Sequence, residues 1–200
     1  HGLNSAPKMI IVKSLGAAES WFVYHADLTS ATYTINLDTT GAQFSNASTW
    51  NSTAPSSSVF SIGTDAGTNG SSVNFIAYCF NDVQGYLKCG SYTGNGNADG
   101  PFVHTGFKPS FVLGKRTDSA GGWWILDSKR PGFNLTDEYL LANDAQAEAS
   151  DGSFASDFLA NGWKARATNG NFNASGGTYI YMAFAENPFT SSAGTPVTAR

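Results

Sequence analysis

The chain contains an internal duplication, which constrains its fold more than any other feature of the sequence. The segment "HGLNSAPKMIIVK" (residues 1–13) is echoed by "HTGFKPSFVLGK" (residues 104–115), with the same spacing from proline to the final lysine. A tryptophan follows that lysine eight residues later in both copies, and "NFIAYCFND" (residues 74–82) matches "TYIYMAFAE" (residues 178–186). Because four anchors recur in one order at an offset near 103 residues, we expect two copies of one structural unit.

Each copy has the pattern of short β-strands separated by turn residues. The expected strands of the first copy are residues 8–13, 20–25, 33–37, 59–63 and 74–80. Their counterparts are residues 110–115, 123–127, 139–142, 158–166 and 178–184. We therefore expect an all-β protein of duplicated β-sandwich or jelly-roll-like (concanavalin-like) units, at residues 1–84 and 85–200.

The two copies differ at their start. A further predicted strand and loop, "GYLKCGSYTGNGNADGPFV", precede the second copy, whereas the first copy begins at His1 without such a segment. Two explanations fit the sequence: upstream residues have been removed, or a neighbouring chain supplies that strand.

The two cysteines flank the junction between the copies. A hairpin with its turn near residues 82–83 would place Cys79 opposite Tyr86 and Cys89 opposite Ile76. The thiols would then be out of register, and a disulfide needs Cα atoms within roughly 7 Å. We therefore favour buried free thiols over a disulfide.

Composition is typical of a protein outside the reducing cytosol or in a virion. Charged residues make up 13% of the chain, against ~25% in an average soluble domain, and Gly, Ser, Thr and Asn supply the polarity. A net charge of −4 disfavours nucleic acid as a partner, because no basic patch would neutralise phosphates. The sequence has neither a long apolar run nor an amphipathic basic helix, so we expect no membrane insertion.

Trp123 and Trp124 are adjacent in a predicted strand, so their side chains leave on opposite faces of the sheet. The face of Trp124 also carries Leu126, and the first copy has Phe22 and Tyr24 there. Because both faces are apolar in both copies, we favour a central strand that is buried on two sides. Two alternatives are a subunit interface formed by these four face residues and a platform that stacks on sugars.

Signatures of catalysis are scarce. The sequence has no G-x-S-x-G, no P-loop, no paired His/Cys metal spacing and no E-x-D-x-E pattern of jelly-roll glucanases. Asp82 and Glu186 occupy equivalent repeat positions, but each stands alone, and glycoside hydrolysis needs two carboxyl groups about 5–9 Å apart. We expect a protein without enzymatic activity and without an obligatory cofactor.

One stretch has the beginning of a calcium loop. In "NGNADG", Asn95, Asn97 and Asp99 present oxygen atoms at alternate positions before a glycine. The acidic residue that should follow six positions later is missing, and ordinary turn chemistry explains the same residues equally well. Calcium is therefore a weak expectation here.

Three aromatic residues are candidates for glycan contact, because an aromatic face beside Asn and Ser suits the C–H surface and hydroxyls of a sugar. They are Trp50, Tyr92 and Trp163, which could contact a glycan if exposed, although we favour a core or corner position for each. Specificity would come from loops. The first loops to consider are residues 45–58, 63–73 and 144–157.

Several motifs together resemble a repeat domain of virion proteins of tailed phages, frequent in phages of marine bacteria and cyanobacteria. The motifs are "WFVYHA", "TAPSSSVFSIGTD", "GSYTGNGNADGPFVHTGFKPSFVLGKRTDSAG" and "GTYIYMAFAENPF", with the repeats quoted above. The resemblance covers nearly the whole chain and implies a lectin-like β-sandwich in a long structural protein, commonly trimeric and in contact with the host surface. It implies no catalytic residues.

From these features we expect a non-enzymatic virion or extracellular protein, the distal module of a tail fibre that adheres to surface polysaccharide as a homo-oligomer, with a trimer favoured. The alternative is a structural role as a capsid decoration or filament subunit. A carbohydrate-active hydrolase is the least favoured reading.

Overall fold

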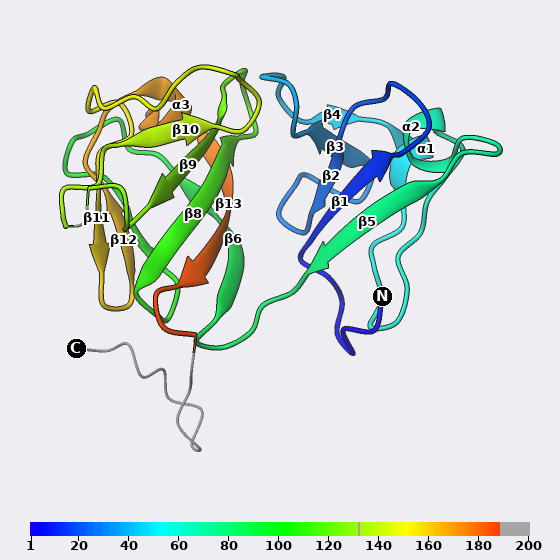
Figure 1. The fold of residues 1–200 in the computed structure, drawn as a ribbon, viewed down its shortest axis with the longest axis horizontal. Coiled ribbons are helices and arrows are strands. Elements are labelled where there is room, and N and C mark those ends of the chain that lie inside the picture. Colours follow the sequence, from blue (N-terminus) through cyan, green and yellow to red (C-terminus); the bar gives the residue numbers. More distant parts are fainter. Residues whose placement is uncertain (132, 189–200) are drawn as a thin grey trace. The chain divides into compact units, whose positions relative to one another are not determined.

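The computed structural model describes residues 1–131 and 133–188 (Figure 1). The chain divides into two compact units, unit 1 (His1–Asn81) and unit 2 (Asp82–Arg200). The division lies close to the one expected between residues 84 and 85. The chain is nearly all β, with several antiparallel sheets, so the predicted fold class is confirmed.

Unit 1 is built on one antiparallel sheet of five strands in the order β4-β3-β2-β1-β5. The strands are β1 (Met9–Ser14), β2 (Phe22–His25), β3 (Tyr33–Asn36), β4 (Phe44–Ser45) and β5 (Phe75–Phe80). Two one-turn helices, α1 (Ala47–Trp50) and α2 (Ala66–Asn69), lie between β4 and β5. Each helix begins at a side-chain cap, because Asn46 and Asp65 accept hydrogen bonds from backbone N–H groups of the first turn.

The core of unit 1 lies on one face of this sheet. Ile10 and Val12 of β1 pack with Phe22 and Tyr24 of β2 against Trp50 at the end of α1. The rings of Tyr24 and Trp50 meet edge to face, with centroids 5.9 Å apart. The connection that carries α1 therefore covers this face of the sheet.

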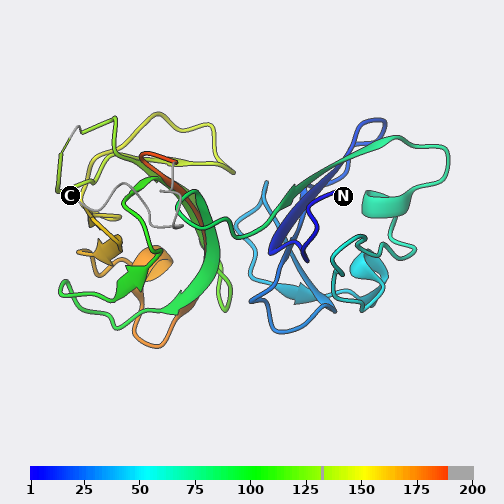
Figure 2. The ribbon, with the colours of Figure 1, turned by 90° about the horizontal axis from the view of Figure 1, so that it is seen from below.

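Unit 2 is a β-sandwich. A five-stranded sheet, β10-β9-β8-β13-β6, faces a three-stranded sheet, β11-β12-β7, and the two form separate layers (Figure 2). The first sheet consists of β6 (Leu87–Thr93), β8 (Pro109–Arg116), β9 (Trp123–Asp127), β10 (Tyr139–Leu141) and β13 (Thr178–Ala185). The second consists of β7 (Phe102–His104), β11 (Ser156–Leu159) and β12 (Gly162–Ala165), and α3 (Gly170–Asn173) leads into β13. Side chains of both sheets share one apolar core.

The sequence repeat corresponds to a repeat of sheet order. Strands β1, β2, β3 and β5 of unit 1 are the counterparts of β8, β9, β10 and β13 of unit 2. The order β3-β2-β1-β5 in the first sheet is therefore the order β10-β9-β8-β13 in the second. The predicted duplication is confirmed at the level of topology, although only unit 2 adds a second sheet.

Three local expectations are wrong. Residues 59–63 form no strand, and residues 158–166 form the β11–β12 hairpin instead of one strand. The hairpin expected around Cys79 and Cys89 does not exist, because β5 pairs with β1 and β6 pairs with β13. An alternating pattern identifies a strand but not its partner. Cys79 and Cys89 form no disulfide, as predicted, although only Cys89 of the two is fully buried.

Trp124 belongs to the core of unit 2. It lies directly opposite Gly114 of β8, where an added Cβ atom would stand 2.0 Å from the indole ring. Its indole meets the ring of Phe172 of α3 at 5.0 Å and that of Trp163 of β12 at 5.9 Å, both edge to face. Trp123 is 1% exposed and Trp124 is 0% exposed, so the buried-strand interpretation of the double tryptophan is confirmed.

The substitution Gly114→Ala is expected to lower the free energy of unfolding by roughly 1–3 kcal/mol, because the new methyl group overpacks the indole of Trp124. The matched control is Gly41→Ala, whose Cβ would be 3.7 Å from its nearest neighbour and which should stay within about 0.5 kcal/mol of the wild type. Denaturant titration followed by tryptophan fluorescence measures both. Equal stability of the two variants would contradict this packing.

Candidate functional site

The aromatic residues expected to contact glycans lie in the interior. Trp50 is 1% exposed and Trp163 is 0% exposed, so the core position favoured for each is confirmed and the alternative of an exposed ring that contacts a glycan is wrong. Tyr92 is half-buried: its ring stacks on Tyr179 at 4.7 Å and meets Trp163 edge to face at 5.1 Å. Its hydroxyl donates to the carbonyl of Phe172 at 2.7 Å, and burial raises its pKa well above the usual value. These rings are used for packing.

The four interface candidates are also buried. Phe22 and Tyr24 are 7% and 6% exposed in the core of unit 1, and Trp124 and Leu126 are 0% exposed in the core of unit 2. The apolar face that each pair presents is covered within its own unit, by the α1 connection in unit 1 and by the three-stranded sheet in unit 2. These side chains therefore do not form an exposed contact surface.

The stretch with calcium-loop spacing is held by turn hydrogen bonds. The side-chain oxygens of Asn95 and Asn97 each accept the backbone N–H two residues on, at 3.0 and 2.9 Å. The carboxylate of Asp99 lies 2.8 Å from Lys164 and 3.5 Å from Arg166, and the hydrogen bond from Lys164 lowers its pKa. Asp99 is the one acidic residue of this stretch, and two cationic side chains already lie beside it, so the stretch does not fit a Ca²⁺ site. Among the residues described, none form a group of three or more His, Cys, Asp or Glu that could hold a metal.

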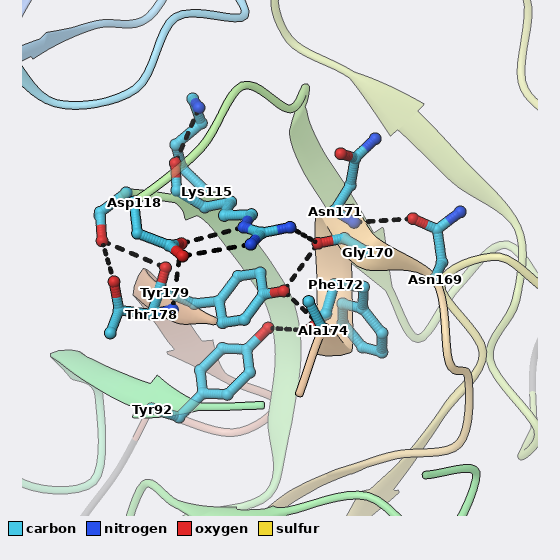
Figure 3. A network of polar contacts seen from close by, with 12 residues as sticks. Tyr92, Lys115, Asp118, Asn169, Gly170, Asn171, Phe172, Ala174, Thr178 and Tyr179 are labelled. Atoms are coloured by element: carbon cyan, nitrogen blue, oxygen red, sulfur yellow. Dashed lines mark hydrogen bonds and ion pairs between the residues drawn. The ribbon is translucent and has the colours of Figure 1, made fainter. Parts of the chain in front are cut away.

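A network of hydrogen bonds links the end of β8 to α3 and β13 (Figure 3). Arg116 donates two hydrogen bonds to the carboxylate of Asp118, at 2.9 and 3.1 Å, and a third to the carbonyl of Gly170 at 2.9 Å. The hydroxyl of Tyr179 donates to the same carbonyl at 2.7 Å and accepts from the N–H of Ala174 at 2.8 Å. The hydrogen bond from Arg116 lowers the pKa of Asp118. The network fastens α3 to β8 and β13, which is a structural role.

Lys115 is a buried lysine that sequence analysis treated only as a repeat anchor. Its side chain is 0% exposed, and its ammonium donates to the carbonyl of Arg116 at 2.8 Å (Figure 3). Burial lowers its pKa from 10.5 to about 8, and the positive charge of Arg116 acts in the same direction. The folded chain therefore releases this proton at a lower pH than the unfolded chain does.

Unit 2 contains a pocket of about 360 Å³. Its walls are Lys108, Ser128, Lys129, Phe133, Asn134, Thr136, Phe158 and Glu186. None of these residues belongs to the three loops expected to carry specificity. The pocket was missed because its walls come from segments far apart in sequence, which only the fold brings together.

The pocket combines an exposed ring with polar groups. The side chain of Phe133 is 81% exposed. Glu186 lies 2.8 Å from the ammonium of Lys108 and 4.0 Å from that of Lys129. The hydroxyl of Ser128 is buried and has no hydrogen-bond partner within residues 1–131 and 133–188. An aromatic face beside ammonium groups and a hydroxyl can bind a polar ligand that also has an apolar side.

Asn134 fixes one wall of the pocket. Its side-chain amide donates to the carbonyl of Phe158 at 2.9 Å and accepts from the N–H of the same residue at 2.9 Å. This pair of bonds ties the segment after Phe133 to β11. The segment therefore has a defined position at the rim of the pocket.

A second pocket of about 300 Å³ is also in unit 2 and contains Asp82, the repeat counterpart of Glu186. Asp82 forms an ion pair with Lys88 and accepts the N–H of Cys89 at 2.8 Å. Each pocket therefore contains one carboxylate next to a lysine. Neither lining supplies the second carboxyl group that general acid–base glycoside hydrolysis uses.

The fold and the pockets define an all-β protein of two repeated antiparallel units, the second of which is a complete sandwich. The chain belongs to the family DUF7483, a domain of unknown function, whose family model matches residues 1–188. No curated protein and no solved structure matches the chain. In the part of the chain that the structure describes, every helix is too short or too polar to cross a membrane.

The lowered pKa of Lys115 predicts a pH dependence of stability. Between pH 8 and 10.5, Lys115 binds more protons in the unfolded chain than in the folded chain. The free energy of unfolding therefore rises with pH over this range, and this gain is lost as the pH falls through about 8. From pH 7.5 to 9.5 the rise is on the order of 2 kcal/mol. Lys115→Met should remove this rise in denaturant titrations at the two pH values. Lys129→Met, at an exposed lysine, should keep it, and the same slope in both variants would contradict the assignment.

Proposed function

We propose that this chain is a non-enzymatic adhesion module of a virion structural protein, the distal part of a phage tail fibre, which binds surface polysaccharide of its host. In this role the chain is extracellular and acts as a homo-oligomer, with a trimer favoured. The observation that carries the glycan-binding part is the pocket at Phe133.

The lining of the pocket matches the chemistry of a sugar. The exposed ring of Phe133 can stack on the C–H face of a pyranose, while the exposed ammonium of Lys129 lies in the same lining. Two lysines and one glutamate leave the lining with one net positive charge. This charge favours acidic polysaccharides, such as those that contain uronic acids, over neutral ones.

Support for the virion part comes from the sequence. The repeat motifs resemble those of tailed-phage virion proteins over nearly the whole chain. A low content of charged residues and two compact β units suit a rigid module outside the cell. Membership of the family DUF7483 assigns no function to the chain and does not conflict with the proposed one.

The alternative is a structural role, as a capsid decoration or filament subunit. One observation favours it: β5 is an edge strand that pairs with β1 alone among the described residues. Edge strands of this kind are used for assembly between chains.

The adhesion role predicts that the chain binds acidic bacterial polysaccharides on a glycan array and that Phe133→Ala weakens this binding about tenfold, because the stacking surface is lost. Titration of the best glycan into wild type and variant measures the change. Phe44→Ala, at an exposed aromatic of unit 1 outside the pocket, should bind as the wild type does.

Unchanged binding by Phe133→Ala would show that the glycan binds elsewhere. An array on which no polysaccharide is bound would contradict the adhesion role and would leave the structural role as the better account.

A further inference from the structure

The three-stranded sheet of unit 2 has a face that the core does not use. Its inner face packs in the core through Val103, Phe158 and Trp163, so the alternate residues of the same strands point outward. The register places six outward residues in two rows across the sheet. One row consists of Leu159, Gly162 and His104, and the other consists of Asp157, Lys164 and Phe102. We call these six residues the outer platform.

Phe102 is an exposed aromatic side chain that rests on the neighbouring strand. An added Cβ atom at Gly162 would stand 2.8 Å from Cζ and 3.1 Å from Cε2 of the Phe102 ring, so the ring occupies the space above this glycine. The side chain of Phe102 is nevertheless 44% exposed. Part of the ring therefore packs on the backbone of β12 and the rest faces solvent. A ring that is already held in place loses little side-chain entropy when a ligand stacks on it.

Charged side chains lie beside this ring in pairs. Lys164 is directly opposite Phe102, and its ammonium is 2.8 Å from the carboxylate of Asp99. Arg166 lies 3.5 Å from the carboxylate of Asp99 and donates to Asp157 at 2.6 Å. Two acidic and two basic side chains leave these pairs without net charge, whereas the lining of the pocket has one net positive charge.

An ion pair beside an aromatic ring matches the chemistry of a neutral sugar. A carboxylate accepts hydrogen bonds from hydroxyl groups and an ammonium donates to them, so Asp99 and Lys164 together offer both kinds of partner to two neighbouring hydroxyls. The ring of Phe102 offers a surface for the C–H face of the same sugar. Because the paired charges cancel, the acidic ligand that suits the pocket has no advantage here.

The size of the outer platform suits a few sugar rings better than a folded protein. Three strands about 4.8 Å apart span roughly 10 Å, and the two rows of outward residues are roughly 7 Å apart along the strands. The resulting area is on the order of 100 Å², whereas each partner of a standard protein–protein interface buries about 800 Å².

We propose that the outer platform is a second glycan site, which binds a neutral stretch of polysaccharide. A pyranose stacks on Phe102 and its hydroxyls bond to Lys164 and Asp99. The ring of His104, whose centroid lies 6.5 Å from that of Phe102, extends the surface to the next sugar of the chain. This site extends the proposed adhesion role and rests on it for its biological use, but it shares no residue with the pocket at Phe133.

The test uses the full chain and three neutral probes, the β-linked hexasaccharides of glucose, mannose and galactose. We expect at least one of them to shift the side-chain ring signals of Phe102 and His104 in a saturable NMR titration. The ring signals of Phe133 should stay in place, because the pocket does not take part.

The variant Phe102→Leu keeps an apolar side chain above Gly162 but removes the aromatic face. It should bind the hexasaccharide about tenfold more weakly, because stacking is lost. Phe102→Tyr retains the ring and should bind within about twofold of the wild type. The matched control is Phe133→Ala, which removes the exposed ring of the pocket and should leave this binding unchanged.

Two results would overturn the proposal. One is the absence of any shift at Phe102 and His104 with all three hexasaccharides. The other is equal affinity of Phe102→Leu and the wild type for a hexasaccharide that binds. Binding of acidic polysaccharide, which tests the proposed function, should stay at the wild-type level in Phe102→Leu, so the two sites can fail separately.

Discussion

The contact between the indole of Trp124 and the bare backbone of Gly114 organises unit 2. Because β8 has no side chain at this point, the indole approaches the backbone of Gly114 closely, and Phe172 and Trp163 meet it edge to face. These two rings come from α3 and from the second sheet. The contact therefore joins the two layers of the sandwich and the segment that leads into β13, and Phe158 of the same core also lines the pocket at Phe133.

The two units cover the same sheet in different ways. Unit 2 covers one face with β11, β12 and β7, whereas unit 1 covers the equivalent face with a connection that places Trp50 over β1 and β2. An irregular cover can bury apolar side chains, but it cannot pair the backbone of an edge strand. Unit 1 is consequently well packed on its sheet face and open at the edge of β5. In unit 2 the equivalent edge, that of β13, pairs with β6.

The duplication made much of the fold predictable. The matching anchors around Lys13 and Lys115 fix which strands correspond, and the structure repeats their order in both sheets. The repeat did not predict which strands pair with one another when they lie far apart in the sequence. The hairpin expected at Cys79 and Cys89 failed because an alternating apolar strand fits any neighbour of suitable length, and the strand before a junction can belong to a different sheet from the strand after it.

The candidate site was less predictable than the fold. Trp50 and Trp163 have polar neighbours in sequence that suggest exposure, yet both rings are covered by segments distant in the chain. The sequence around Phe133 did not indicate a site, because an aromatic in a turn-rich segment becomes part of a pocket only when Lys108 and Glu186 lie beside it in the fold. Such sites depend on tertiary contacts, which local patterns do not encode.

The central claim is that the chain contains two copies of one sheet. In the second copy β13 pairs with a further strand, β6, whereas its counterpart β5 in the first copy has no described strand on that side. Hydrogen exchange of the free chain tests this most directly at the repeat-equivalent residues Ala77 and Tyr181. The account predicts fast exchange of the amide of Ala77, which faces the open edge, and slow exchange of the amide of Tyr181, which faces β6. Equally slow exchange of both amides would contradict it.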